Sequence, residues 1–126
     1  IGRLVGSEMC IRDRIRPMLY GSHHQIKNIS NPKGKERFYT VVGYICETDT
    51  FGSNRKIAEI NEGDILMFKN AGAYCFTMSS NYNSRLRPAE VLWHNNRAHT
   101  IRKQETLDDL ISNQILIDFS EKVEIN

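Results

Sequence analysis

The sequence predicts a mainly β domain, arranged as an antiparallel β-sandwich or Greek-key barrel with one helix near its C-terminal end. Two observations support this fold class. Short segments rich in β-branched and aromatic residues, separated by turn-forming residues, follow one another from Ile15 to Arg102. One helical pattern then begins near Thr106. A chain of 126 residues has room for one domain with a modest core.

Residues 37–45 form the strongest predicted strand. Side chains on both of its faces are largely apolar, which favours a strand that is covered on both sides. Further strands are expected at residues 16–20, 25–29, 55–60, 64–69, 74–79, 89–93 and 98–102. Strands at this spacing are typical of an antiparallel sandwich or barrel.

The predicted helix has Thr106 as its N-cap and acidic residues in its first turn, where they interact favourably with the helix dipole. Its apolar stripe, expected to be buried, consists of Leu107, Leu110 and Ile111. Residues 115–126 begin with a weak alternation and then turn polar, so we expect a poorly fixed tail.

Charge and cysteine content argue against several classes of function. Lys and Arg number 17 against 15 Asp and Glu, without a basic stripe, so nucleic-acid binding has no electrostatic support. The three cysteines lack CxxC spacing, which predicts neither a zinc site nor a disulfide framework and favours a reducing, cytoplasmic location. His23 and His24 have no further ligand nearby in sequence, so no metal is expected. No apolar run approaches the roughly 20 residues of a membrane span.

Three sequence blocks carry a family resemblance. They are RPMLY at residues 16–20, GYICE at residues 43–47 and GAYCFTMSSNYNSRLRPAEVL at residues 72–92. In order and rough spacing they resemble the diaminopimelate decarboxylases, which are fold-type III pyridoxal-phosphate enzymes. The resemblance covers residues 15 to about 114 and corresponds only to the C-terminal β-domain. The (α/β)8 barrel, with the lysine that binds the cofactor covalently, is not part of this sequence.

Cys46 and Glu47 are the most specific pair of candidate active-site residues. The resemblance implies that Cys46 is the catalytic proton donor and that Glu47 binds the distal ammonium of the substrate. Neighbouring side chains on a strand point to opposite faces, so both can meet one substrate only if the strand ends there. Residues 48–52 are expected to supply that ending. Without the resemblance, a cysteine that closes an apolar strand is more often a small core residue.

The other two blocks supply the remaining candidates. Arg16 and Tyr20 match residues that bind a substrate carboxylate in the family, and a planar guanidinium suits bidentate carboxylate recognition. Tyr74 matches a tyrosine that contacts both the cofactor and the substrate. The alternatives are a solvated arginine and a half-buried sheet tyrosine. Residues 78–85 are rich in turn-forming side chains and are assigned to positioning rather than catalysis.

The first residues are interpreted separately. Residues 4–13 read like the translation of a sequencing adaptor, so residues 1–14 are predicted to be a non-native leader and are left out of the fold prediction. The alternative is a short native helix. The domain plan is therefore a leader at 1–14, a C-terminal β-domain at 15–114 and a tail at 115–126.

The resemblance implies a carboxy-lyase that uses pyridoxal 5'-phosphate to convert meso-diaminopimelate to L-lysine and CO2. It also implies a homodimer in which Cys46 and Glu47 serve the active site of the partner subunit. This chain alone is expected to be inactive and to self-associate or dissolve poorly, because surface that the barrel covers would be exposed. One alternative is a sister enzyme acting on ornithine, arginine or carboxynorspermidine. The other is a non-catalytic β-barrel binding module of the oligonucleotide-binding kind.

Overall fold

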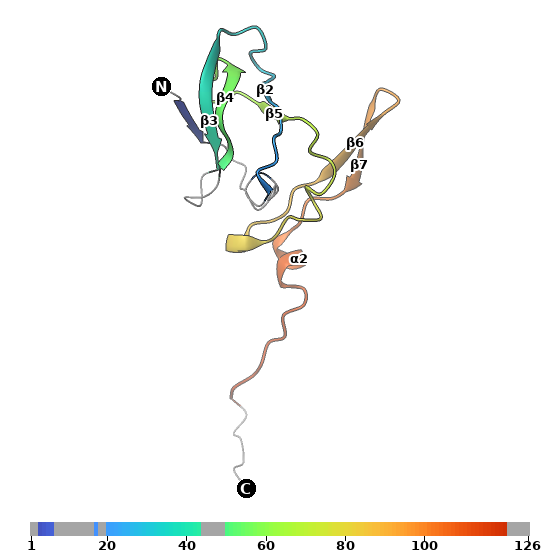
Figure 1. Ribbon diagram of the computed structural model, residues 1–126. Coiled ribbons are helices and arrows are strands. Elements are labelled where there is room, and N and C mark those ends of the chain that lie inside the picture. Colours follow the sequence, from blue (N-terminus) through green and yellow to red (C-terminus); the bar gives the residue numbers. More distant parts are fainter. Residues whose placement is uncertain (1–2, 7–16, 18–19, 44–49, 121–126) are drawn as a thin grey trace. The chain divides into compact units, whose positions relative to one another are not determined.

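The computed structural model describes residues 3–6, 17, 20–43 and 50–120 (Figure 1). The chain divides into two compact units, residues 1–82 and 83–126.

The first unit contains two small sheets (Figure 1). One has the order β1-β3-β4, with strands β1 (Arg3–Gly6), β3 (Glu36–Val42) and β4 (Thr50–Ala58). In it, β3 pairs antiparallel with β4 and parallel with β1. The other sheet pairs β2 (Ile26–Asn28) antiparallel with β5 (Leu66–Phe68).

The core of the first unit lies between these sheets. Its buried members are Ile26, Tyr39, Val41, Phe51 and Ile57. The Phe51 ring packs at a tilt against Phe68, with the ring centroids 5.2 Å apart. The buried Tyr39 hydroxyl is satisfied because it accepts a hydrogen bond from the backbone N–H of Ile60 at 3.0 Å. Burying each large apolar side chain contributes about 1.5–3 kcal/mol, so this cluster holds the unit together.

One polar side chain, Asn28, is buried beside this core with 3% of its surface exposed. Its amide donates to the Glu59 carbonyl at 2.9 Å and to Asp64 Oδ2 at 2.7 Å. Its Oδ1 accepts from the backbone N–H groups of Ser30 and Asn31 at 3.0 and 3.1 Å. Because every polar atom of the side chain has a partner, Asn28 fixes the loops at this end of the unit without an unsatisfied group.

The second unit is built around a hairpin. β6 (Glu90–His94) and β7 (Arg97–Arg102) pair antiparallel across a two-residue turn, in which Asn95 and Asn96 both have left-handed backbone (φ 48° and 57°). This is the conformation of a type I′ turn, which asparagine tolerates well. A 3-10 turn, η2 (Tyr82–Ser84), precedes the hairpin.

The helix α2 (Leu107–Ile111) follows the hairpin and begins with the expected cap. The Thr106 Oγ1 accepts from the backbone N–H of Asp109, and the Asp109 carboxylate accepts from the backbone N–H of Thr106. This reciprocal capping box confirms the predicted start of the helix. The predicted buried stripe is wrong, because Leu107 and Ile111 are 67% and 50% exposed, Leu110 is only partly buried, and α2 has no buried residue.

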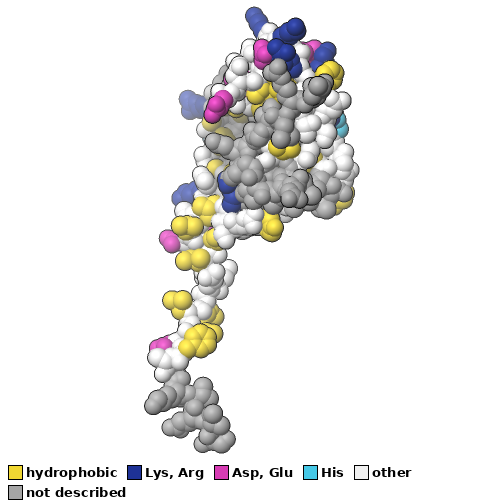
Figure 2. Space-filling model, turned by 90° about the vertical axis from the view of Figure 1, so that its left-hand side faces the viewer, with side chains coloured by type: hydrophobic (Ala, Val, Ile, Leu, Met, Phe, Trp, Pro, Cys, Tyr) yellow, Lys and Arg dark blue, Asp and Glu magenta, His cyan; other side chains and the backbone are white. Residues whose placement is uncertain are grey.

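Apolar side chains also lie exposed along the segment that follows α2 (Figure 2). The exposed fractions reach 87% and 98% for Ile115 and Leu116, and residues 115–118 form neither helix nor strand. The poorly fixed tail stays a prediction. Among the described residues, no helix has the length and apolar character needed to cross a membrane.

The mainly β class is confirmed, and the strands β2, β3, β5, β6 and β7 lie where the sequence predicts them. Two predicted strands are wrong. Residues 74–78 form a turn, and both described residues of the segment 16–20, Pro17 and Tyr20, have helical backbone. Proline favours the first turn of a helix because its φ is fixed near −65°. The described residues form three small sheets and no closed barrel.

β3 and β4 differ in detail from the prediction. Tyr39 and Val41 are buried, but Phe38 on the other face of β3 is 49% exposed, so the described residues cover only one face of this strand. β4 begins at Thr50, five residues before the predicted start at Arg55. Residues 50–52, predicted to belong to a strand-ending turn, are therefore part of a strand.

Residues 3–6 form a strand on the edge of β3 rather than part of a helix. Their assignment to a non-native leader stays a prediction.

Candidate functional site

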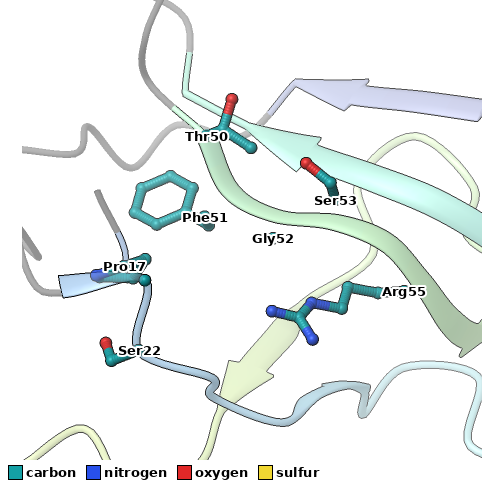
Figure 3. Close-up of a pocket in the computed structure, with 8 residues that line it drawn as sticks. Pro17, Ser22, Thr50, Phe51, Gly52, Ser53 and Arg55 are labelled. Atoms are coloured by element: carbon teal, nitrogen blue, oxygen red, sulfur yellow. The ribbon is translucent and has the colours of Figure 1, made fainter. Parts of the chain in front are cut away.

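An open pocket of about 300 Å³ lies on the first unit, between the start of β4 and the segment at residues 17–22 (Figure 3). Its lining residues come from two segments distant in sequence and are Pro17, Gly21, Ser22, Thr50, Phe51, Gly52, Ser53 and Arg55. Hydroxyl groups and one guanidinium share this lining with an aromatic ring and a proline. The pocket can therefore receive a molecule with both polar and apolar parts.

The first half of β4 forms one wall. Phe51 is buried, and its ring is turned toward Pro17 across the pocket (Figure 3). The Arg55 side chain runs from β4 beneath Gly52 toward the side where Pro17 and Ser22 lie (Figure 3). This wall of the pocket therefore carries both an apolar ring, that of Phe51, and a positive charge, that of Arg55.

The segment after Tyr20 forms the other wall. Gly21 has left-handed backbone (φ 59°), which a glycine adopts without strain and which turns the chain. The two nitrogens of the His24 ring lie 3.1 Å from the Lys69 carbonyl and 3.1 Å from Ser22 Oγ. His23 extends elsewhere and contacts Arg55 Nη1. The two histidines thus take separate roles in holding this segment, as the divergence of adjacent side chains predicts.

Three of the five predicted site residues, Arg16, Cys46 and Glu47, lie outside the described residues. Their neighbours in the chain line the pocket from opposite walls: Pro17 follows Arg16 directly, and Thr50 comes three residues after Glu47. The structure thus brings together the flanks of the first two sequence blocks.

The two described site residues are tyrosines with accessible side chains. Tyr20 is 67% exposed and Tyr74 is 58% exposed, and neither lines the pocket. Tyr74 has left-handed backbone (φ 64°), and its carbonyl accepts a hydrogen bond from the Met78 N–H at 3.2 Å. The alternative interpretation of Tyr74 as a half-buried sheet residue is therefore wrong.

Local hydrogen bonds explain why the third block turns. The Ser79 hydroxyl donates to the Phe76 carbonyl at 2.6 Å, and the Ser79 N–H donates to the same carbonyl at 3.0 Å. These bonds compete with strand pairing. The predicted turn-forming character of this segment thus includes Ser79.

Sequence reasoning missed the pocket contributions of Gly52 and Arg55. Residues 48–52 favour a turn by composition, because threonine, aspartate and glycine are common there. The available signal was the glycine itself, since a glycine within a run of strand-forming residues often marks a bulge or a close approach.

The described residues hold no group of three His, Cys, Asp or Glu side chains that could bind a metal ion. Arg55 is the charged group of the pocket lining.

Comparison with known proteins identifies the family. Residues 4–72 match the family model described as "Pyridoxal-dependent decarboxylase, C-terminal sheet domain". The chain is 42% identical over 114 residues to a diaminopimelate decarboxylase of Methanothermobacter thermautotrophicus, and 44% identical over 104 residues to one of Archaeoglobus fulgidus. These matches cover 89% and 81% of this chain but 27% and 25% of the relatives.

Solved structures agree. The crystal structure of diaminopimelate decarboxylase from M. jannaschi matches with a TM-score of 0.81 and 34% identity, over 90% of this chain and 26% of that chain. The Helicobacter pylori enzyme, complexed with L-lysine, matches with a TM-score of 0.78 and 33% identity, over 88% of this chain and 28% of that chain.

The chain thus spans about a quarter of the length of these relatives. These findings favour the enzyme family over the alternative of an oligonucleotide-binding module. The match over residues 4–72 shows that this chain belongs to the pyridoxal-dependent decarboxylases, as their C-terminal sheet domain.

Proposed function

We propose that this chain is the C-terminal domain of a diaminopimelate decarboxylase, which converts meso-diaminopimelate to L-lysine and CO2. One observation of the structure carries the proposal. The pocket joins the segment that follows Arg16 to the strand that follows Cys46 and Glu47. Two blocks that resemble substrate-contacting motifs therefore meet at one place, although about thirty residues separate them in the chain.

The proposed roles divide by chemistry. Arg16 and Tyr20 bind a carboxylate of the substrate, because a guanidinium fork and a phenol hydroxyl are matched hydrogen-bond donors. Glu47 binds the distal ammonium. Cys46 returns a proton to the carbon that loses CO2. A thiol with an ordinary pKa near 8.5 is mostly protonated at neutral pH and can donate.

Bound pyridoxal 5'-phosphate supplies the electron sink for decarboxylation. The described residues fit a domain that completes a cofactor site begun elsewhere. The accessible Tyr74 side chain, 58% exposed, suits contact with a cofactor and substrate held by another part of the enzyme. No described residue is assigned to holding the cofactor covalently.

We also propose the wider architecture. The domain at residues 15–114 forms an antiparallel sandwich or Greek-key barrel, preceded by a non-native leader at 1–14 and followed by a tail at 115–126. The enzyme is a cytoplasmic homodimer, and Cys46 and Glu47 of each subunit complete the active site of the other. The cysteine usage, without a disulfide pattern, supports a reducing compartment.

A chimaera tests the function. Residues 15–120 replace the matching segment in the Methanothermobacter relative, and CO2 release is measured with meso-diaminopimelate, ornithine and arginine. We expect turnover of meso-diaminopimelate. Cys46→Ala should lower kcat by about 10²–10⁴, the usual contribution of a positioned proton donor.

Cys75→Ala is the matched control and should leave kcat within about twofold of the unsubstituted chimaera, since Cys75 is assigned no chemistry. Faster turnover of ornithine or arginine than of meso-diaminopimelate would show that the chain comes from a sister decarboxylase instead. Equal effects of Cys46→Ala and Cys75→Ala would remove Cys46 from the mechanism.

The 126-residue chain alone should show no decarboxylation and should self-associate. Sedimentation velocity tests the second point, and a clean monomer would contradict it. The exposed apolar side chains of the second unit, such as Trp93 and Leu116, motivate this expectation.

A further inference from the structure

The strand β4 carries an irregularity next to the pocket. Tyr39 of β3 pairs with Arg55, but Val41 pairs with Gly52, so two steps along β3 match three along β4. Asn54, within the extra step, has left-handed backbone (φ 51°), and its N–H donates to Thr40 Oγ1 at 3.2 Å. This is a β-bulge with the left-handed residue that such bulges use.

The bulge changes which side chains share a face. In a regular strand, residues three apart point to opposite faces. Here Arg55 folds back over Gly52: a Cβ on Gly52 would lie 2.5 Å from Arg55 Nε and 3.1 Å from Arg55 Cγ. A Cβ at position 52 would therefore displace the Arg55 side chain.

The far end of the Arg55 side chain reaches the other wall. Its Nη1 contacts Nδ1 of His23 and lies 3.2 Å from Nε2 of the same ring. Arginine only donates hydrogen bonds, so the ring nitrogen that faces Nη1 is the acceptor. His23 lies three residues after Tyr20, so Arg55 connects β4 to the segment that presents the proposed carboxylate-binding residues.

Arg55 is partly buried, and its Nε lies against Gly52. Its Nε is buried and has no hydrogen-bond partner in the part of the chain that the structure describes. Arg37 and Lys56, on the same sheet, pair with Glu59 and Glu36 at 2.7 and 2.6 Å. An unsatisfied buried donor is costly, so a purely structural position here would favour an apolar residue.

Building on the proposed function, we infer that Arg55 is a positioning residue. Laid across Gly52, it holds the segment at residues 21–23 against β4 and thereby fixes the segment next to Tyr20, a proposed carboxylate-binding residue. It acts on substrate binding through this segment and does not itself touch the reacting atoms.

A double-mutant cycle in the chimaera tests the inference. Gly52→Ala and Arg55→Ala should each raise KM for meso-diaminopimelate about tenfold, with kcat changed less than about threefold, because binding geometry is lost and the proton donor is intact. The double variant should be no worse than Arg55→Ala alone, since alanine at position 52 acts only by displacing Arg55. Arg55→Lys, which keeps a cation and a donor for His23, should restore KM to within about threefold.

Lys56→Ala is the matched control, because Lys56 is the adjacent cation on β4 and pairs with Glu36. It should leave both constants unchanged. Additive effects of Gly52→Ala and Arg55→Ala, a fall in kcat at constant KM, or an equal effect of Lys56→Ala would overturn the positioning role.

A measurement on the 126-residue chain separates this inference from the proposed function. The imidazole resonances of His23, observed by NMR, should shift in Gly52→Ala and in Arg55→Ala but not in Lys56→Ala. Unchanged His23 resonances in Arg55→Ala would refute the contact, whatever the substrate of the enzyme. Shifted resonances with an unchanged KM would refute the positioning role and leave the decarboxylase proposal intact. Far-UV circular dichroism verifies that each variant is folded, and Arg55→Ala still tests the contact if Gly52→Ala does not fold.

Discussion

The two units of this chain bury their apolar residues to very different extents. In the first unit Val41, Phe51 and Tyr39 are 0, 1 and 2% exposed. In the second unit no described residue is classed as buried, and Trp93 is 68% exposed. Both units have regular strands and tight turns, so the difference lies in packing and not in local structure.

This contrast teaches which part of the chain is self-sufficient. An isolated two-stranded hairpin is marginal in water, because its hydrogen bonds alone do not offset the entropy of ordering it. The first unit has two sheets that cover one core. In the second unit, apolar side chains of β6, β7 and α2 are exposed, as are those of the tail (Figure 2). We expect the first unit to determine the stability of this chain.

The largest expected effect is that of Phe51→Ala, which should destabilise the chain by about 3–5 kcal/mol, because it removes a ring packed on Phe68 at the centre of the core. Urea unfolding followed by far-UV circular dichroism measures it. A change below about 1 kcal/mol would mean that the first unit does not have a stabilising core.

Asn28→Ala should have the next largest effect, about 1–3 kcal/mol. The substitution leaves Asp64 and two backbone N–H groups without the buried amide that now bonds them. The same urea titration measures it. Lys27→Ala, at the exposed neighbouring position of β2, is the control and should stay within about 0.5 kcal/mol of the unsubstituted chain.

Acid should also distinguish the units. Hydrogen bonds from the Asn61 N–H and then from the Asn28 side chain lower the pKa of Asp64 below its ordinary 3.8. The stabilisation from its ionised form is thus present above pH 3.8 and is lost as pH falls below it toward the folded-state pKa. In Asp64→Asn, the free energy of unfolding should fall less between about pH 5 and about pH 3 than it does in the unsubstituted chain. Urea unfolding at the two pH values measures this difference.

Asp109 provides the matched acidic control in the second unit. The Thr106 backbone N–H and then its side chain lower the pKa of Asp109. Asp109→Asn should therefore reduce helical circular dichroism above about pH 4 without moving the urea midpoint. A shift of the midpoint equal to that of Asp64→Asn would show that both units unfold together.

The smallest effect is expected for Trp93→Ser, within about 0.5 kcal/mol on this chain, because the side chain is exposed. In the chimaera the same substitution should be more destabilising, since the added domain provides a surface that can cover the hairpin. Equal small effects in both settings would mean that the exposed face of the hairpin stays uncovered.

Much of the fold was predictable because its signals are local. Turn-forming residues such as Asn95 and Asn96 delimit β6 and β7, and the Thr106 cap identifies the start of α2. The failures have a shared cause. Tyr74 and Phe76 favour a strand by composition, but hydrogen bonds of Ser79 to nearby backbone favour a turn. Residue propensity alone does not say whether strand pairing or these local hydrogen bonds will prevail.

The site was predictable only in part. The three sequence blocks carry enough specific residue types to suggest the family. The relation of Arg55 to Gly52 could not be derived from alternation, because the bulge at Asn54 reverses the face on which the following residue lies. The extra residue in this step of β4 thus brings Arg55 beside Gly52 at the pocket.

The type I′ turn at Asn95 and Asn96 has a consequence for the order of assembly. Its twist matches that of the flanking strands, so the hairpin can close within microseconds without help from distant residues. A covering domain would then meet strands whose register the turn has already set. Because the hairpin alone is marginal in water, burial against that domain would keep it closed, and docking would be coupled to this last ordering step.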